Sequence, residues 1–465
     1  MVCSSRSELR ASLEKKVEGN VKEDFRGRRV TVVGLARSGV AAARALHALG
    51  AIVTVTDIKP LDQLGAQVKS LGDDRIVVKG GGHPDGIFLE ADLIVLSPGV
   101  PRIPQIRAAQ HRGIHVISEL ELAWLLSDAP YVGITGTNGK STVTTLVGLM
   151  LRRARKKVLV AGNIGNALTE DIALLKQRDW IVAELSSFQL EYIETFHPRI
   201  AAILNVTQDH LDRYHDIAEY GEAKTRILMN QRKDDFAILN FDDPLVKSYA
   251  NRTSATVIPF SRLLRFSPGA CLLDGYLTFN NRRIIRTDEI KIKGVHNLEN
   301  ALAAVALSMC ADADSVSVAA VLREFPGLEH RLEFVREKDG VAWINDSKGT
   351  NVGAVVKSVE GFTNPVILIA GGLDKGSDFS PLCNLFKEKV KLLILIGKAA
   401  DKMAKALGSS TETVFAQTLQ DAVKLAAAQS SRGDVVLLSP ACASFDMFRD
   451  FEDRGRQFKE AVMNL

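Results

Sequence analysis

The sequence predicts an α/β protein of three domains, each built around a mostly parallel sheet. A chain of 465 residues exceeds what a single hydrophobic core usually supports. Short apolar runs alternate with helical patterns along most of the chain, as in successive βαβ units. Two glycine-rich turns, at 34–39 and at 136–139, each follow an apolar run. Turns of this kind come after the strand that leads into a nucleotide-binding site.

The first domain is expected at 25–122 and opens as a Rossmann-like nucleotide-binding fold. Its elements are expected, in chain order, as a strand, a helix and two further strands at Val30–Val33, Val40–Leu49, Ile52–Thr56 and Leu93–Leu96. An acidic residue, Asp57, follows the second strand, as in dinucleotide-binding folds. The glycine spacing is incomplete because Ala36 and Ser38 interrupt GxGxxG. The turn Ser97-Pro98-Gly99 is either a ligand loop or a simple connection.

The second domain, expected at 123–328, carries the most informative motif. Gly136-Thr137-Asn138-Gly139-Lys140-Ser141-Thr142 lies between an apolar strand, Tyr131–Thr135, and a helix, Val143–Leu151. Backbone N–H groups and the helix dipole at such a turn face a phosphate, the lysine neutralises outer phosphates, and the hydroxyl suits Mg²⁺. Ile134 stands where the usual pattern has its first glycine, so this P-loop is a variant. The motif predicts ATP binding.

The remaining elements extend the P-loop sheet and build a third domain, expected at 329–465, with a dinucleotide-fold-like sheet. In the second domain, strands are expected at Trp180–Ala183 and Ile200–Asn205, short β runs over 236–290, and a helix at Asn297–Met309. In the third domain, helical segments separate most of the apolar runs at Val341–Ile344, Val366–Ala370, Leu392–Ile396 and Val435–Leu438.

Chemically useful side chains follow the carboxyl ends of these apolar runs: Glu184, His210, Asp346, Lys375 and Ser444. Ligands of open parallel sheets bind at that edge. Glu184 suits the metal-holding acid of a P-loop domain, because Mg²⁺ takes few carboxylates beside phosphate oxygens and water. His210 could ligate a metal, orient a base or be a surface histidine, and its position alone favours the last. Lys224 by itself would be one more exposed helix lysine.

Composition excludes several classes of protein. A net charge of +4 gives no reason to expect nucleic acid or an acidic membrane as a partner. Five scattered cysteines without a CxxC pair suggest neither disulfides nor zinc and fit a reducing cytosol. No apolar run approaches the length of a membrane span. We therefore expect a cytoplasmic protein without membrane insertion, preceded by a polar, flexible extension at 1–24 to which we assign no function. A monomer is our further expectation, which composition does not determine.

Several motifs together resemble the Mur ligase family, the ATP-dependent amide ligases that build the peptidoglycan stem peptide. The resemblance covers 26–465, and its motifs are 135–142, Glu184-Leu185-Ser186-Ser187-Phe188-Gln189-Leu190, 205–212 and Gly294-Val295-His296-Asn297 with Asn300-Ala301. Two further segments, 345–351 and 438–446, resemble the D-glutamate-adding members. Ala36 and Gly349 depart from frequent family residues, glycine and alanine respectively. The implied reaction joins D-glutamate to UDP-N-acetylmuramoyl-L-alanine through an acyl phosphate.

The resemblance also implies roles for the catalytic and metal-binding residues. Lys140 stabilises the transferring phosphate, with Lys348 as a further catalytic residue. Ser141 and Glu184 hold one Mg²⁺, and His210 and Lys224 hold or orient a second. Lys224 is expected to be carbamylated, which converts a cation into a carboxylate-like metal ligand. The amine must be neutral to capture CO₂, so its pKa must fall well below about 10.4.

Three substrate sites follow from the same resemblance. ATP is expected on the P-loop residues Gly136 to Thr142 and on Asn297, Asn300, Arg331 and Asp346. The UDP substrate is expected on Ser38, Asp57, Ser97, Pro98, Gly99 and Asn163, and D-glutamate on Thr350, Lys375, Ser444 and Phe451.

Three other interpretations compete with this one. A folylpolyglutamate-synthase-like ligase shares the central ATPase, but it lacks the N-terminal nucleotide fold and the segment Asp346-Ser347-Lys348. An oxidoreductase would need an intact glycine fingerprint and NAD(P)H binding. A non-catalytic ATP-binding switch would not need Glu184, His210 and Lys224, and it would show no acceptor-dependent turnover.

Overall fold

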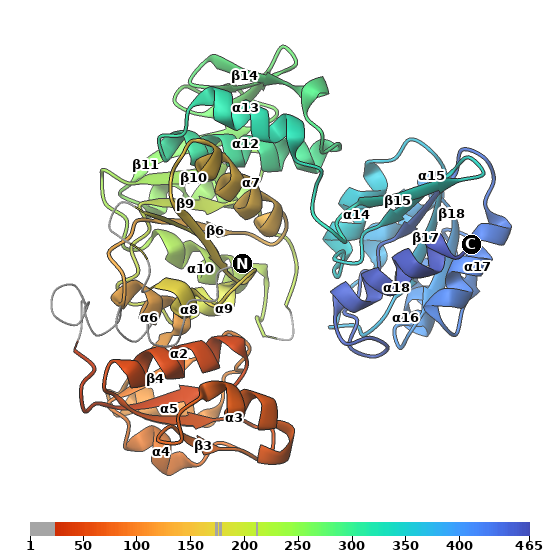
Figure 1. Cartoon of the computed structure of the whole chain (residues 1–465). Helices are drawn as coiled ribbons and strands as arrows, with labels where there is room; N and C mark the ends of the chain where they lie inside the picture. The colour runs from red at the N-terminus through yellow and green to blue at the C-terminus, as the bar shows by residue number, and fades with distance from the viewer. Residues whose placement is uncertain (1–23, 173–174, 176–178, 211–212) are drawn as a thin grey trace. The chain divides into compact units, whose positions relative to one another are not determined.

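The computed structural model describes residues 24–172, 175, 179–210 and 213–465 (Figure 1). Contacts divide the chain into two compact units. One comprises Met1–Val206, Ala218–Ile290 and Glu299–Arg323, and the other Thr207–Ile217, Lys291–Leu298 and Glu324–Leu465. Except for Asp24, the extension expected at 1–24 lies outside the described residues.

The first sheet is five-stranded and wholly parallel, in the order β3-β2-β1-β4-β5. Its strands are β1 Arg29–Val33, β2 Ile52–Thr56, β3 Val77–Lys79, β4 Leu93–Leu96 and β5 His115–Ser118. The helices are α2 Arg37–Ala48, α3 Gly65–Leu71, α4 Asp85–Leu89, α5 Pro104–His111 and α6 Glu119–Leu125. This order reverses direction between β1 and β4, the point where open α/β sheets bind ligands. It confirms the Rossmann-like prediction.

The central sheet has nine strands in the order β14-β13-β12-β11-β10-β9-β6-β8-β7. They are β6 Tyr131–Thr135, β7 Val158–Gly162, β8 Trp180–Glu184, β9 Ile200–Ile203, β10 Phe236–Asn240, β11 Thr256–Ser261, β12 Ala270–Leu273, β13 Tyr276–Phe279 and β14 Arg282–Arg286. Its helices are α7 Lys140–Arg153, α8 Leu168–Asp171, α9 Ser187–Glu191, α10 Ile217–Thr225, α11 Pro244–Ser248, α12 Val295–Cys310 and α13 Ser315–Glu324. The sheet is parallel except for the pairs β12–β13 and β13–β14 at one edge. Strand β6 is buried along its whole length, as expected for a parallel strand covered on both faces.

The third sheet has six strands in the order β15-β16-β20-β17-β18-β19, with only β15 antiparallel. The strands are β15 Glu333–Lys338, β16 Val341–Asn345, β17 Val366–Gly371, β18 Val390–Ile396, β19 Thr413–Phe415 and β20 Val435–Leu438. The helices are α14 Val352–Glu360, α15 Cys383–Lys389, α16 Ala400–Leu407, α17 Leu419–Gln429 and α18 Phe451–Met463. Alternate β17 residues join two apolar cores, one with α14, α15 and α16 and the other with α17 and α18.

Several element boundaries differ from the sequence predictions. The first helix begins at Arg37 rather than Val40, so Ser38 and Gly39 are helical. Strand β8 includes Glu184 as its last residue, and β9 ends at Ile203 rather than Asn205. The helix expected at Asn297–Met309 spans Val295–Cys310. As a result, the glycine-rich turn after β1 leads directly into the first helix, and Glu184 is the last residue of its strand, at the carboxyl end of the sheet.

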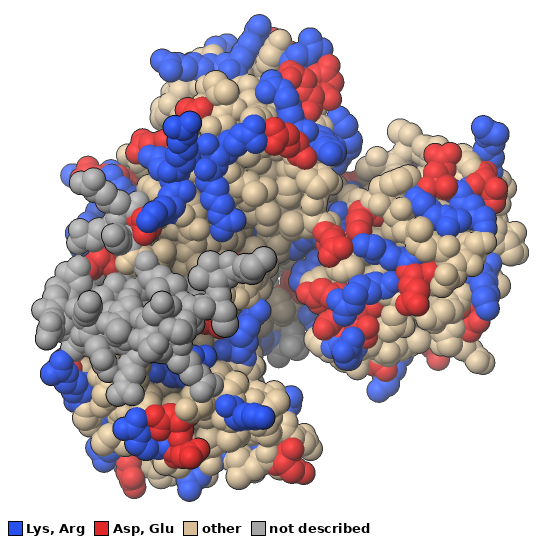
Figure 2. Space-filling model, viewed as in Figure 1, with Lys and Arg blue, Asp and Glu red and all other residues tan. Residues whose placement is uncertain are grey.

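Charged residues of both signs are mixed over the face shown in Figure 2, consistent with the nearly balanced composition. Within the part of the chain that the structure describes, no helix is long and apolar enough to cross a bilayer.

Candidate functional site

The P-loop is a glycine turn between β6 and the N-terminus of α7. Gly139 is the residue before the helix, with φ +86°, and Gly136 has φ +150°. A Cβ atom at Gly139 would lie 2.2 Å from the Asn300 Oδ1 atom, so a larger residue is sterically excluded there. Asn300, which was predicted to bind ATP, is therefore packed against the phosphate loop itself.

Asn205 fastens the P-loop to the end of β9. Its side-chain Oδ1 accepts a hydrogen bond from the Asn138 N–H at 2.8 Å, and its Nδ2 donates to the Asn138 carbonyl at 3.1 Å. The Asn205 carbonyl also accepts from the Thr137 N–H at 2.9 Å. Sequence reasoning gave this residue no role. The sequence analysis placed Asn205 at the end of an expected strand and at the start of the 205–212 motif, without a role of its own.

Two lysine ammonium groups meet at the same P-loop carbonyl. Lys140 Nζ donates to the Gly136 and Thr137 carbonyls, both at 2.8 Å. Lys224 Nζ donates to the Gly136 carbonyl at 3.0 Å and lies 4.3 Å from the centre of the Tyr220 ring. Lys224 is only 1% exposed, so its interpretation as an ordinary surface lysine is wrong.

Glu184 reaches the same sheet edge from β8, which lies next to β6. Asn163 Nδ2 donates to Glu184 Oε1 at 2.9 Å, and the turn at Gly162 passes so close that a Cβ there would lie 2.4 Å from the Glu184 carbonyl. The buried Glu184 Oε2 and the buried Thr135 hydroxyl have no hydrogen-bond partner among the described residues. Unpaired buried oxygens of this kind suit a cation.

The side chains at the carboxyl ends of β6 and β8 are therefore suitable ligands for a magnesium ion. Ser141 is buried in the first turn of α7, and Glu184 offers its unpaired oxygen. Over 24–172, 175, 179–210 and 213–465, no group of three or more His, Cys, Asp or Glu side chains could hold a metal. A nucleotide-bound Mg²⁺ needs no such group, because phosphate oxygens and water supply most of its ligands.

In the first sheet, the turn after β1 is held by the loops that follow β2 and β4. The Asp57 carboxylate accepts from the Leu35 N–H at 2.7 Å, and the Ser97 hydroxyl donates to the Gly34 carbonyl at 3.0 Å. A Cβ at Gly39 would lie 1.8 Å from that carbonyl, so glycine is required. The structure thus brings Asp57 and Ser97 to one turn. Ser38, Pro98 and Gly99 lie on the elements that adjoin it.

In the third sheet, Asp346 follows β16 and is buried. Its Oδ2 accepts from the hydroxyls of Ser439 and Ser358 at 2.7 and 2.8 Å. Burial raises the pKa of the Asp346 carboxyl to about 6, against the opposing effect of these hydrogen bonds. The Asp346 side chain thus links the loop after β16 to α14 and to the loop after β20, while its place near ATP stays a prediction. Arg331 lies close enough for its charge to act on this carboxyl.

The loops after β17 and β20 pair with each other through a bridge between Leu373 and Ala443. This pairing brings the loop of Lys375 beside that of Ser444, which is 2% exposed. The buried Arg454 donates to the Ser347 carbonyl at 2.8 Å and to the Cys442 carbonyl at 3.3 Å. Arg454, which sequence reasoning missed, therefore joins the loops after β16 and β20.

Three of the predicted site residues line one cavity of about 370 Å³: His210, Thr350 and Lys375. All three belong to the second unit. Phe451 lies outside this lining and instead contacts Lys348, whose Nζ is 3.5 Å from its ring centre. Asn297 lies in the first turn of α12 and donates to the Lys293 carbonyl at 2.8 Å. The cavity is thus lined by one residue that was predicted to bind a metal and by two that were predicted to bind D-glutamate.

A phosphate loop on a mostly parallel sheet, preceded in the chain by a Rossmann-like sheet and followed by a third α/β sheet, defines a nucleotide-dependent three-domain protein. Three family models match the chain in order: Mur ligase MurD-like, N-terminal domain over 28–118, Mur ligase middle domain over 134–308, and Mur ligase, glutamate ligase domain over 330–442. The chain belongs to the Mur ligase family.

Among curated proteins, the chain is similar to the UDP-N-acetylmuramoylalanine–D-glutamate ligase of Geotalea uraniireducens (strain Rf4). The two are 49% identical over 442 residues, which is 94% of this chain and 98% of the relative. The ligase of the same name from Clostridioides difficile (strain 630) is 42% identical over 453 residues, covering 95% of this chain and all of that protein.

Solved structures share the fold at lower identity. A pseudomurein peptide ligase type C from Methanothermus fervidus superposes with a TM-score of 0.61 at 19% identity, covering 94% of this chain and 100% of that one. UDP-N-acetylmuramate–alanine ligase from Thermotoga maritima gives 0.60 at 20% identity, covering 94% and 99%.

Proposed function

We propose that this protein is an ATP-dependent ligase that joins D-glutamate to UDP-N-acetylmuramoyl-L-alanine, a step of peptidoglycan precursor synthesis. The observation that carries the proposal is the match to UDP-N-acetylmuramoylalanine–D-glutamate ligases over nearly the whole chain, at 49% identity in one case. All three domains take part in that match. The preformed P-loop supports the ATP dependence independently.

The reaction needs positioning and charge neutralisation rather than a protein nucleophile. The L-alanine carboxylate of the UDP substrate attacks the γ-phosphorus of ATP, and ADP leaves. The amine of D-glutamate then attacks the acyl carbon of this acyl phosphate, and phosphate departs with the bridging oxygen as the amine loses its proton. Negative charge spreads over the phosphoryl oxygens in the first step, so cations and N–H donors lower its barrier.

The P-loop supplies these groups at the end of β6. The Thr137 and Asn138 N–H groups are bonded to Asn205, so the N-terminus of α7 is the part of the loop that would face an anion. Lys140 donates to the loop carbonyls of Gly136 and Thr137 and would exchange them for a phosphate. Asn205 keeps the turn in shape before the nucleotide arrives. Magnesium, held by Ser141 and Glu184 with the nucleotide, would neutralise phosphate charge and orient the phosphoryl group.

Lys224 is the candidate for carbamylation. It is buried and lies beside the P-loop, where a negatively charged carbamate could serve a second magnesium together with His210. Capture of CO₂ requires an uncharged amine. We infer that Lys224 acts as the carbamate. This assignment rests on the family resemblance together with the burial.

The substrate residues are proposed on the same basis. The UDP moiety would contact Ser38, Asp57, Ser97, Pro98 and Gly99 beside the β1 turn, with the muramoyl part near Asn163. D-Glutamate would lie in the cavity of Thr350 and Lys375, with its side-chain carboxylate on Lys375 and the Ser444 hydroxyl. Asn297, Asn300, Arg331 and Asp346 would surround ATP, with Lys348 and Phe451 near the reacting groups. The proposed domain boundaries are 25–122, 123–328 and 329–465.

A phosphate-release assay tests the proposal. The protein is incubated with ATP, Mg²⁺, UDP-N-acetylmuramoyl-L-alanine and one amino acid at a time, and the product mass is determined. Release that depends on both the UDP substrate and D-glutamate, with the mass of the amide product, is the expected result. Turnover with a different amino acid would leave the ATPase assignment intact and refute the D-glutamate assignment.

A further inference from the structure

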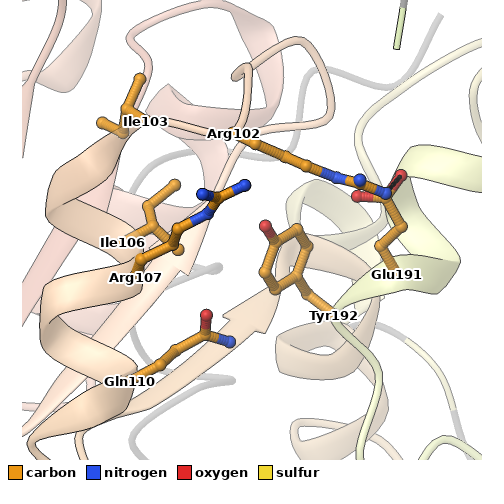
Figure 3. A pocket seen from close by; sticks show the side chains of 7 residues that line it. All are labelled: Arg102, Ile103, Ile106, Arg107, Gln110, Glu191 and Tyr192. Atoms are coloured by element: carbon orange, nitrogen blue, oxygen red, sulfur yellow. Dashed lines mark ion pairs between the residues drawn. The ribbon is translucent and has the colours of Figure 1, made fainter. Parts of the chain in front are cut away.

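A second cavity, of about 320 Å³, lies in the first unit between α5 and the segment that ends α9 (Figure 3). None of the residues predicted to bind ATP, the UDP substrate or D-glutamate lines it. Its lining combines apolar, aromatic, amide and charged side chains: Arg102, Ile103, Ile106, Arg107, Gln110, Glu191 and Tyr192. The proposed reaction therefore leaves this cavity without a role.

One wall is formed by one face of α5 together with Ile103, the residue that precedes the helix. Ile103, Ile106, Arg107 and Gln110 recur at the spacing that places helix residues on one side. Ile106 is 1% exposed and belongs to the apolar core of the first sheet, whereas Arg107 and Gln110 are exposed. Figure 3 shows the side chains of Arg107 and Gln110 extending from the helix toward Tyr192. The wall thus has an apolar floor and a polar rim.

The opposite wall is tied to α6 and β5 by hydrogen bonds. The Tyr192 carbonyl accepts from the Ser118 N–H at 2.8 Å, which ties the segment to the end of β5. The buried Glu121 carboxylate accepts from the N–H groups of Glu194, Thr195 and Phe196 at 2.8–3.0 Å. Because these bonds are made within the protein, the cavity is shaped before any ligand arrives.

The cations of the cavity differ in their partners. Arg102 forms ion pairs with Glu219 at 2.9 Å and Glu191 at 3.5 Å. Arg107 makes no hydrogen bond or ion pair with any residue that the structure describes. Its guanidinium is therefore the uncompensated charge, next to an isoleucine floor and a phenol ring. A planar guanidinium pairs best with a planar or tetrahedral oxyanion through two parallel hydrogen bonds.

We propose that this cavity binds a small organic anion with a flat apolar body, its carboxylate or phosphate group on Arg107 and its body against Ile103, Ile106 and Tyr192. The Gln110 amide can donate to the same anion. The volume is at the lower end for small-molecule sites, which suits a compact single-ring ligand. Because its walls come from α5 and the end of α9, a bound ligand would tie an element of the first sheet to one of the central sheet.

Calorimetric titration of the full-length protein with three probes tests the proposal. Benzoate and phenyl phosphate carry the two candidate anions on the same ring, and benzamide is the neutral counterpart. At least one of the anions should bind with 1:1 saturation, about fivefold or more tighter than benzamide. The stronger of the two identifies the anion class, and inorganic phosphate alone should bind more weakly than phenyl phosphate.

The variant Arg107→Gln should lose this preference for the anion, and Arg112→Gln is its matched control. Arg112 is exposed at the C-terminal end of the same helix but does not line the cavity, so its removal should leave binding unchanged. Because neither variant touches a predicted substrate residue, binding of the probes at those sites would be equal in both. Equal affinities of Arg107→Gln and wild type, equal binding of benzamide, or no saturable binding of either anion would each overturn the proposal.

Discussion

Replacing Asn205 by alanine perturbs the P-loop without substituting any residue that the nucleotide is expected to contact. The substitution removes two hydrogen bonds, the 2.8 Å bond from the Asn138 N–H and the 3.1 Å bond to the Asn138 carbonyl. The bond from the Thr137 N–H to the backbone carbonyl of residue 205 remains, because it does not need the side chain. The turn therefore stays attached to β9 but loses its side-chain clamp.

The expected size of the effect follows from those two bonds. A hydrogen bond of this kind contributes about 0.5–1.5 kcal/mol net, so two contribute about 1–3 kcal/mol. If that free energy is used to order the turn before binding, its loss weakens ATP binding by about 5- to 150-fold. The site is part-buried rather than dry, which favours the lower half of this range.

The assay is a titration of ATP at saturating levels of the other substrates, with the melting temperature measured in parallel. Asn364→Ala is the control, because it also removes an amide that donates one bond, to the Gly433 carbonyl at 2.7 Å, but in an exposed loop of the third domain. We expect a raised KM for ATP in Asn205→Ala only. An unchanged ATP KM in a folded Asn205→Ala protein would refute the clamp argument.

Three further substitutions test other parts of the site. Lys375→Ala should raise the KM for D-glutamate by about tenfold or more, since it removes a charge-assisted bond, and change that for ATP little; equal effects would contradict the assignment. Lys224→Ala should lose most activity, and bicarbonate should not restore it; wild-type-like turnover would refute the carbamate role. Asp346→Asn should remove a pH-dependent loss of stability. Burial raises the pKa of the Asp346 carboxyl to about 6 in the folded protein, whereas in the unfolded chain this carboxyl ionises near pH 4. The free energy of unfolding of the wild type should therefore fall between about pH 4 and 6, by up to about 3 kcal/mol, and stay level above pH 6. Urea denaturation at several pH values measures this free energy for both proteins. The same change between pH 4 and 6 in wild type and Asp346→Asn would contradict the prediction.

Much of the fold could be predicted because the sequences of buried parallel strands are continuous apolar runs. Strands β2, β4, β6 and β20 begin and end where the sequence placed them. Short or half-exposed strands gave no such signal. Strand β15 carries Glu333, Arg336 and Glu337 at the sheet edge, where one face meets water and the apolar run disappears.

The site was predicted in part, and the limit lies in long-range contacts. The P-loop was recognisable because its chemistry is local, with glycines, lysine and hydroxyl in one short segment. The burial of Lys224 against Gly136 depends on packing between α10 and the P-loop, which no local pattern contains. Arg454 and Asn205 were missed for the same reason, since each acts on loops distant in the chain. An arginine in a polar helix and an asparagine after a strand carry no visible mark of such contacts.

The most direct test of the central claim is to follow one oxygen atom. UDP-N-acetylmuramoyl-L-alanine with an ¹⁸O-labelled L-alanine carboxylate is incubated with the protein, ATP, Mg²⁺ and D-glutamate, and the released phosphate is analysed by mass. Ligation through an acyl phosphate transfers one carboxylate oxygen to phosphate, so each phosphate should carry one ¹⁸O, in step with formation of the amide. Phosphate without the label, or labelled equally without D-glutamate, would contradict the account.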